Sequence, residues 1–197
     1  MNIIGDVGGQ FEAFKRLLDK MPKEETVCVG DLVDRGPDSM KVIEYCIASG
    51  IKSLRGNHED MMLDFYAHGQ KRRYRNGSDP PWFNNGGIAT LKSYDVPLTR
   101  DIEKIHVGFK ERISVEHVEW LQSNPLYILS EGLLITHAPV SHKLKTWQDC
   151  LVDDDAYEHG NYVLWCRQVP NVRSTEGIYF QVFGHNAYGM GLKWFGG

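Results

Sequence analysis

Three short predicted strands, each followed by glycine and a polar residue, constrain the fold of this chain more than any other feature. The strands are residues 2–4, 26–29 and 51–54, and the pairs that follow them are Gly5-Asp6, Gly30-Asp31 and Gly56-Asn57. Between the strands lie two segments with apolar residues at helical spacing, one from Phe11 to Leu18 and one closed by Gly50. Strands that alternate with helices over such short connections predict parallel pairing through right-handed crossovers. The sequence therefore predicts the α/β class.

The rest of the chain shows fewer regular patterns. The predicted elements are two helices, 58–67 and 115–123, and two late strands, 133–136 and 179–183. The polar, irregular stretch 69–87 is a candidate lid or insert. The length and the lack of a linker favour a single domain over residues 1–197.

Composition excludes several classes of protein. Twenty-two basic and 26 acidic residues give a net charge of -4, so a nucleic-acid partner is not expected. A hydrophobic content of 42% excludes wholesale disorder. No stretch approaches the ~18 apolar residues that span a bilayer, and the N-terminus does not resemble a secretory signal. Four cysteines without a CxxC pair predict reduced core thiols, which suits a cytoplasmic protein without a membrane partner.

The polar residues that follow the predicted strands suit a metal ion. They are Asp6, Asp31, Asn57, His137 and His185. Ligands of open α/β sheets bind outside the carboxyl ends of the strands, so these side chains can reach one place. Two carboxylates, an amide oxygen and two imidazoles suit manganese, iron or zinc. Each residue alone could be a turn former, a helix cap or a buried polar group. The coincidence of five favours a metal site.

Several segments also carry a resemblance to a known family. They are GDVGGQ (5–10), GDLVDRG (30–36), GNHE (56–59), NNGG (84–87), THAP (136–139), LWCR (164–167) and FGHN (183–186). They resemble the motifs of the phosphoprotein phosphatase family of calcineurin-like metallophosphoesterases, and most closely its small bacterial and phage branch, typified by bacteriophage lambda phosphatase. The resemblance implies two central mixed β-sheets flanked by helices, in α-β-β-α layers.

The same resemblance implies two divalent metal ions and assigns their ligands. Asp31 would bridge the two metals, since a carboxylate can hold them about 3.5–4 Å apart. Asp6 would bind the first metal, and Asn57, His137 and His185 would complete the second. Manganese is the expected metal, and iron, zinc and magnesium stay open.

The resemblance also implies catalytic and phosphate-binding residues. His58 would protonate the leaving oxygen, and Asp34 would hold its imidazole in the required tautomer. Arg35, Arg167 and Asn57 would contact the substrate, because a guanidinium fork matches phosphate oxygens. The alternatives are an exposed surface residue for Arg35 and a helix-end salt bridge for Arg167.

One position departs from the family pattern Gly-Asp-x-His-Gly, because Gly8 stands where the pattern has a metal-binding histidine. No histidine precedes His58 in the chain. Three histidines from distant loops are the alternatives: His68, His142 and His159. The first metal would then rest on Asp6, Asp31 and water, an oxygen-rich set that suits manganese or magnesium better than zinc.

The family pattern also continues after its last histidine into a further strand pair, whereas this sequence ends at Gly197. A shorter sheet, a truncated chain and a sheet edge supplied by a partner stay open as explanations. An unpaired edge favours association, and the oligomeric state is left open.

These observations predict a metal-dependent phosphoric-ester hydrolase that acts on phosphorylated serine, threonine or tyrosine in proteins, or on a small phosphate ester. One alternative is a hydrolase of dinucleoside polyphosphates or a phosphodiesterase. Another is a largely inactive phosphate-binding module. Gly8 favours the inactive module, whereas the Asp34–His58 pair favours turnover, because a binding module needs no proton donor.

The basic run from Lys71 to Arg75 has two interpretations. It is a solvated loop, or it belongs to a lid in which Trp82 helps to hold an anionic substrate or stack on a base.

Overall fold

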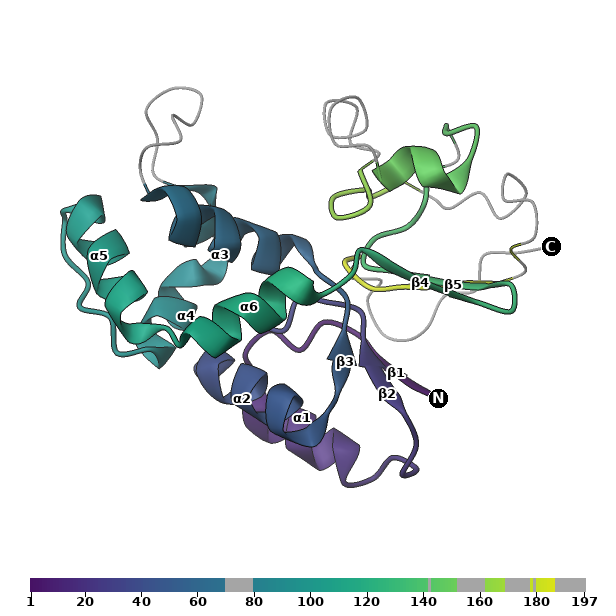
Figure 1. The fold of residues 1–197 in the computed structure, drawn as a ribbon, viewed down its shortest axis with the longest axis horizontal. Helices are drawn as coiled ribbons and strands as arrows, with labels where there is room; N and C mark the ends of the chain where they lie inside the picture. Colours follow the sequence, from purple (N-terminus) through teal and green to yellow (C-terminus); the bar gives the residue numbers. More distant parts are fainter. Residues whose placement is uncertain (70–79, 142, 152–161, 169–177, 179, 187–197) are drawn as a thin grey trace.

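A computed structural model describes residues 1–69, 80–141, 143–151, 162–168, 178 and 180–186 (Figure 1). Its strands form two small sheets in the right half of Figure 1, and most of its helices lie to the left and below. Hydrophobic clusters join helices to the first sheet, the first sheet to the second, and the second sheet to a further helical segment. The expected α-β-β-α layers are therefore present.

The first sheet contains three parallel strands in the order β1-β2-β3. They are β1 (Asn2–Ile4), β2 (Thr26–Cys28) and β3 (Lys52–Ser53), connected by the helices α1 (Phe11–Leu18) and α2 (Ser39–Ser49). Phe14 of α1 and Val42 of α2 are buried in the same cluster as Cys28, which places both helices against the sheet. Helix α2 ends at Gly50, whose φ of 65° is the left-handed conformation that glycine adopts without strain. The predicted succession of strands and helices is confirmed.

A second group of helices packs beside this sheet. They are α3 (Asn57–His68), the π-helix η2 (Phe83–Gly87), α4 (Ile88–Ser93), α5 (Ile102–Arg112) and α6 (Val115–Ser123). Phe65, Trp82 and Phe109 are fully buried and hold these helices together, with ring centroids 5.3 to 6.2 Å apart. Helix α6 begins after Ser114, whose side chain accepts the Glu116 N–H. The sequence predicted α3 and α6, whereas α4 and α5 were not predicted.

The second sheet is mixed, with the order β4-β5-β6. Its strands are β4 (Tyr127–Ser130), which is antiparallel to β5 (Leu133–Thr136), and β6 (Phe180–Phe183), which is parallel to β5. Val29, Leu54 and Ile135 form the buried contact between the two sheets. On the other face, Leu134 packs in a cluster with Trp147 of the 3-10 helix η3 (Trp147–Leu151). The strands β5 and β6 were predicted, and β4 was not.

The segment predicted as a lid or insert is only partly described, because residues 70–79, and with them Lys71 to Arg75, lie outside the described residues. The described residues 81–87 of this segment are helical, and Trp82 is 1% exposed. A side chain so deeply buried cannot stack on an incoming base. The lid interpretation is therefore wrong for Trp82, because its indole belongs to the aromatic core.

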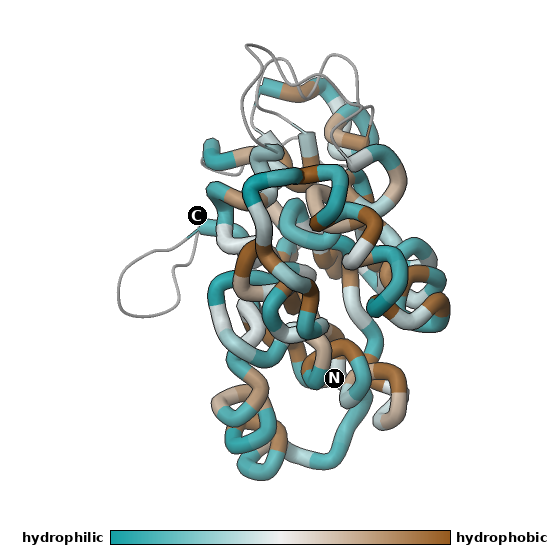
Figure 2. The backbone as a smooth tube through the Cα atoms, turned by 90° about the vertical axis from the view of Figure 1, so that its left-hand side faces the viewer, coloured by the Kyte–Doolittle hydropathy of each residue, from teal (hydrophilic) through white to brown (hydrophobic). Residues whose placement is uncertain are grey.

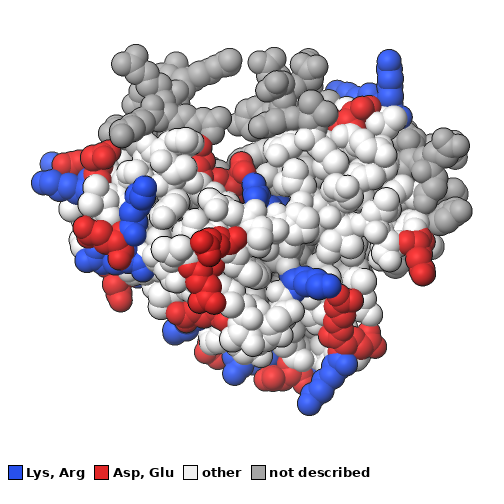
Figure 3. Space-filling view, in the orientation of Figure 1, with Lys and Arg blue, Asp and Glu red and all other residues white. Residues whose placement is uncertain are grey.

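Among the described residues, no helix has the length and apolar character needed to cross a membrane. Hydrophobic and hydrophilic residues are interspersed along the backbone tube (Figure 2). Acidic and basic side chains lie mainly in the left and lower parts of the visible face, where both signs are mixed (Figure 3). All four cysteines are buried and free, as predicted.

The buried imidazole of His117 in this core leads to a prediction about how stability depends on pH. The Tyr94 hydroxyl lies 2.8 Å from Nδ1 of His117, and burial lowers the pKa of His117 below its usual value near 6.5. The unfolded chain therefore binds this proton more readily, so stability falls as pH drops below about 6.5. We expect the unfolding free energy to decrease more between pH 8 and pH 5 in the wild type than in His117→Phe, measured by urea denaturation with chelator.

Tyr94→Phe is the control for this prediction. It removes the hydroxyl but leaves the buried imidazole, so it should lower stability at both pH values and keep most of the pH dependence. Equal pH dependence in the wild type and His117→Phe would contradict the prediction.

Candidate metal and phosphate site

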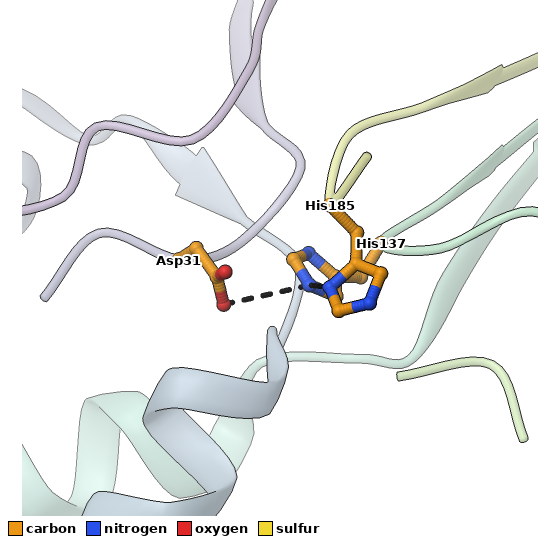
Figure 4. Close-up of side chains that lie close together, drawn as sticks. All are labelled: Asp31, His137 and His185. Atoms are coloured by element: carbon orange, nitrogen blue, oxygen red, sulfur yellow. Dashed lines mark hydrogen bonds and ion pairs between the residues drawn. The ribbon is translucent and has the colours of Figure 1, made fainter. Parts of the chain in front are cut away.

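Residues from both sheets meet where the strands end. Asp31 follows β2, His137 follows β5 and His185 follows β6, and ligand atoms of all three lie within 4.8 Å of one another. Figure 4 shows their side chains converging from separate loops. Asn57, the first residue of α3, joins them. These four predicted residues are thus brought together by elements far apart in the sequence.

Three of the four offer donor atoms in a small triangle. Asn57 Oδ1 lies 3.0 Å from Nε2 of His137 and 2.9 Å from Nδ1 of His185. The two imidazole nitrogens are 3.2 Å apart. The other nitrogen of His137, Nδ1, lies 2.9 Å from the Val29 carbonyl oxygen, to which it can only donate. A neutral His137 therefore presents a bare lone pair at Nε2.

This donor set fits a divalent cation. One N–H at most can lie inside a triangle of three potential acceptors, so a cation satisfies the three lone pairs better than hydrogen bonds do. Burial lowers the pKa of His137, and burial, followed by the neighbouring His137, lowers that of His185 to about 3. Both imidazoles are therefore neutral at pH 7, which is the form that binds metals.

Asp31 supplies the negative charge at the centre of the site. Its Oδ1 lies 3.4 Å from Nε2 of His137, and the residue is 3% exposed. Burial raises the pKa of Asp31 to about 7, partly offset by His58, so an adjacent cation would favour its charged form. Asp31 has a left-handed φ of 52°, a conformation unusual for residues other than glycine.

Asp6 lies at the exposed edge of the same site. Its Oδ1 accepts the His185 N–H at 3.1 Å, and its charge contributes to raising the pKa of Asp31. Its carboxylate is not among the ligand atoms that lie within 4.8 Å of one another. Asp6 therefore lies outside the compact cluster, and a second, more open metal position between Asp6 and Asp31 stays a prediction.

His58 and Asp34 form a pair beside this cluster. His58 Nδ1 lies 2.6 Å from Oδ2 of Asp34, and both residues are buried. Burial alone would lower the pKa of His58, but the hydrogen bond to Asp34 and nearby carboxylates raise it above its usual value. His58 Nε2 faces Asp31 Oδ2 at 3.8 Å and Arg35 Nη2 at 2.8 Å. Because a guanidinium only donates, Nε2 is the acceptor there and Nδ1 carries the proton that bonds Asp34.

Two residues to which the sequence analysis gave no such role hold Asp34. Trp82 Nε1 donates to both carboxylate oxygens at 3.0 Å, and Thr90 Oγ1 donates to Oδ1 at 2.6 Å. Their sequence signal is weak, because Trp82 precedes the NNGG segment and Thr90 follows it without a polar motif of its own. With the bond from His58, these donors stabilise a fully buried carboxylate.

Two arginines border the site. Arg35 is exposed, has a left-handed φ of 63°, and lies against Gly86, where any Cβ would collide with it. Arg167 is exposed too, and its charge is the third cause of the low pKa of His185. Both guanidinium groups can reach solvent near the cluster, as phosphate binding requires.

Gly8 adopts a left-handed φ of 55° in the loop after β1, and a Cβ there would meet only the Asp34 carbonyl oxygen, at 3.8 Å. A histidine at this position would have space but a strained backbone, costing about 1–2 kcal/mol. Of the histidines considered as substitutes, His68 ends α3, and His142 and His159 lie outside the described residues.

Comparisons with known proteins find several similar sequences and structures. A sequence model described as calcineurin-like phosphoesterase matches residues 2–188. The chain is 38% identical over 86 residues to serine/threonine-protein phosphatase 1 of Salmonella typhimurium, covering 41% of the chain and 39% of that protein. It is 42% identical over 154 residues to a symmetrical bis(5'-nucleosyl)-tetraphosphatase of Paracidovorax citrulli, covering 73% of the chain and 44% of that protein.

A solved serine/threonine phosphatase of Saccharomyces cerevisiae matches with a TM-score of 0.43 and 22% identity, over 75% of this chain and 40% of that one. The chain thus spans less than half the length of each of these three proteins. Similarity to the phage branch stays a prediction, since these matches do not bear on it.

The geometry at Gly8 leads to a prediction about the more open position. We expect Gly8→His to tighten the weaker step of Mn²⁺ binding about 10-fold or more, because it adds an imidazole near Asp6 and Asp31. The measurement is calorimetric titration of chelator-stripped protein. Gly8→Ala is the matched control, since it carries the same backbone strain without the imidazole, and equal affinities in the two variants would refute the prediction.

Proposed function

Because the chain belongs to the calcineurin-like phosphoesterase family, which is metal-dependent, we propose that it hydrolyses phosphate esters or anhydrides with divalent cations bound at the strand ends. The observation that carries this proposal is the triangle of Asn57, His137 and His185 donors next to a buried His58–Asp34 pair. A ligand cluster alone would suit a binding protein. A proton-carrying pair beside it suits a catalyst.

We assign the metal ligands as Asn57, His137, His185 and Asp31, with Asp6 and the second oxygen of Asp31 at the more open position. Divalent cations held there would neutralise phosphate charge and make water a stronger nucleophile at neutral pH. Manganese is the proposed metal, because the mixed nitrogen and oxygen donors and the oxygen-only position both accept it.

The protein's own residues then provide the proton and the phosphate contacts. Asp34 keeps the His58 proton on Nδ1, so Nε2 faces the site. When the Arg35 guanidinium turns from Nε2 to a phosphate oxygen, Nε2 is free to carry a proton to the leaving oxygen. Arg167 would bind a phosphate oxygen from the opposite side, beside His185.

For the substrate, we propose a dinucleoside polyphosphate in preference to a phosphorylated protein. The support is that the bis(5'-nucleosyl)-tetraphosphatase aligns over a larger part of the chain than the serine/threonine phosphatase does. A phosphorylated serine or threonine in a protein is the second candidate, supported by the 38% identity to the Salmonella enzyme.

Substrate preference can be measured directly. We expect kcat/KM for diadenosine tetraphosphate to exceed that for a phosphoserine peptide and for p-nitrophenyl phosphate by at least about 10-fold, a difference of roughly 1.4 kcal/mol in transition-state binding. The assay uses chelator-stripped protein reloaded with Mn²⁺, and chromatography identifies the nucleotide products.

Asp31→Asn serves as the control for contaminating phosphatases, since it removes the central carboxylate. A higher kcat/KM for the peptide would favour the second candidate. If the protein binds Mn²⁺ but hydrolyses none of the three substrates, the result would favour the phosphate-binding module and contradict the proposal.

The role of His58 predicts a dependence on the leaving group. We expect His58→Asn to lower kcat about 10²–10⁴-fold for an alkyl phosphate, whose leaving alkoxide needs a proton, and much less for p-nitrophenyl phosphate. Mn²⁺ affinity should be retained. His106→Asn is the control, because His106 is also buried but bonds the Tyr66 carbonyl oxygen instead of a site residue. Equal slowing for both leaving groups would exclude the proton-donor role.

A further inference from the structure

Glu59 has a buried carboxylate that accepts hydrogen bonds from two separate loops. It is the third residue of α3 and is 0% exposed. Its Oε2 accepts the N–H groups of Asp31 and Gly56, both at 2.8 Å. Its Oε1 accepts those of Leu32 at 2.7 Å and Val33 at 3.3 Å. All four partners are donors, so the side chain satisfies them only as an acceptor on both oxygens.

A helix cap explains only one of these four bonds. The bond from Gly56, which precedes α3, is the capping-box contact expected of a glutamate at this position. The other three come from the loop after β2, more than twenty positions earlier in the chain. A residue that served the helix alone would have no need of them.

The loop after β2, which Glu59 bonds, contains a residue with a strained backbone. Asp31 has a left-handed backbone, which costs about 1–2 kcal/mol in a residue with a side chain. The Glu59 carboxylate accepts hydrogen bonds from the N–H of Asp31 and from those of the next two residues, Leu32 and Val33. These bonds offset the cost of the Asp31 backbone conformation. The same carboxylate bonds Gly56, immediately before Asn57, and so connects the ends of β2 and β3.

Close packing makes this connection rigid. A Cβ on Gly56 would collide with the Asp31 carboxylate and with Oε2 of Glu59. The His58 N–H also donates to Oδ1 of Asp31 at 3.1 Å. The position of the Asp31 carboxylate relative to Asn57 therefore depends on where the Glu59 side chain sits.

We propose that Glu59 is a positioning residue that sets metal affinity by fixing the Asp31 carboxylate against Asn57. The inference rests on the proposed metal site and deepens it. Glu59 touches neither substrate nor metal, and it acts through the backbone of the Asp31 loop.

The test is calorimetric Mn²⁺ titration of chelator-stripped Glu59→Gln. Glutamine keeps the size of the side chain, but its NH₂ group faces two backbone N–H donors that then lose their acceptor. We expect Kd to rise about 10–100-fold, the usual effect of losing a group that orients a metal ligand. The unfolding transition of the metal-free variant is recorded alongside, to show that the protein is folded.

Ile105→Ala is the control for general destabilisation. Ile105 is buried in α5, outside the Asp31 loop, and its truncation lowers stability by creating a cavity. We expect its Mn²⁺ Kd to stay within about two-fold of the wild type, below the 10-fold effect of losing an orienting group. Equal loss of affinity in both variants would mean that Glu59 acts only through stability, and an unchanged Kd in Glu59→Gln would also overturn the proposal.

Two further results keep the test decisive. If Glu59→Gln does not fold, amide hydrogen exchange in the wild type replaces it. The Leu32 and Val33 amides should then exchange as slowly as those of β2, and fast exchange would overturn the proposed role of Glu59. If the wild type does not bind Mn²⁺, both the metal site and the role of Glu59 are overturned. If the wild type binds Mn²⁺ and Glu59→Gln has the same Kd, only the role of Glu59 is overturned.

Discussion

The packing of one sheet on the other is the constraint on which the site depends. Val29, Leu54 and Ile135 form a small buried contact there, and His137 follows Ile135 by two residues. The His137 ring crosses the contact and donates to the Val29 carbonyl oxygen, a bond between residues 108 positions apart. That bond fixes the tautomer of His137 and directs Nε2 toward the oxygen atoms of Asn57 and Asp31, which follow strands of the first sheet. His137 and His185 follow strands of the second sheet and Asp31 follows a strand of the first, so this contact brings the imidazoles to the carboxylate.

Burial then shifts the pKa values of the three clustered groups His137, His185 and Asp31. It favours neutral imidazoles at His137 and His185 and raises the pKa of Asp31, so the metal-free site carries little net charge where ligands converge. Asp34 differs in its surroundings, because three side chains, those of His58, Trp82 and Thr90, donate hydrogen bonds to its carboxylate. The molecule thus separates a cluster suited to cations from a pair suited to proton transfer, although both come from neighbouring loops.

Much of the candidate site could be predicted because of a simple geometric rule. The carboxyl ends of parallel strands share one edge of a sheet, so the order of strands and polar residues along the chain is enough to place Asp31 near Asn57. The same rule does not reveal which residues support them. Trp82 and Thr90 reach Asp34 from 48 and 56 positions away, and three of the four bonds of Glu59 cross 26 to 28 positions. Their residue types are common in ordinary cores and caps, so sequence patterns alone did not assign these roles.

The sequence by itself determined the α/β succession and the residue types at the ends of the first three strands, because apolar periodicity and glycine turns are local properties. Only the tertiary structure decided that Trp82 is core rather than lid, that Glu59 spans two loops, and that Gly8 has space beside it. These outcomes depend on packing between segments distant in the chain. Local pattern sets which side chains are available, and the burial and hydrogen bonds that assembly creates set what each of them does.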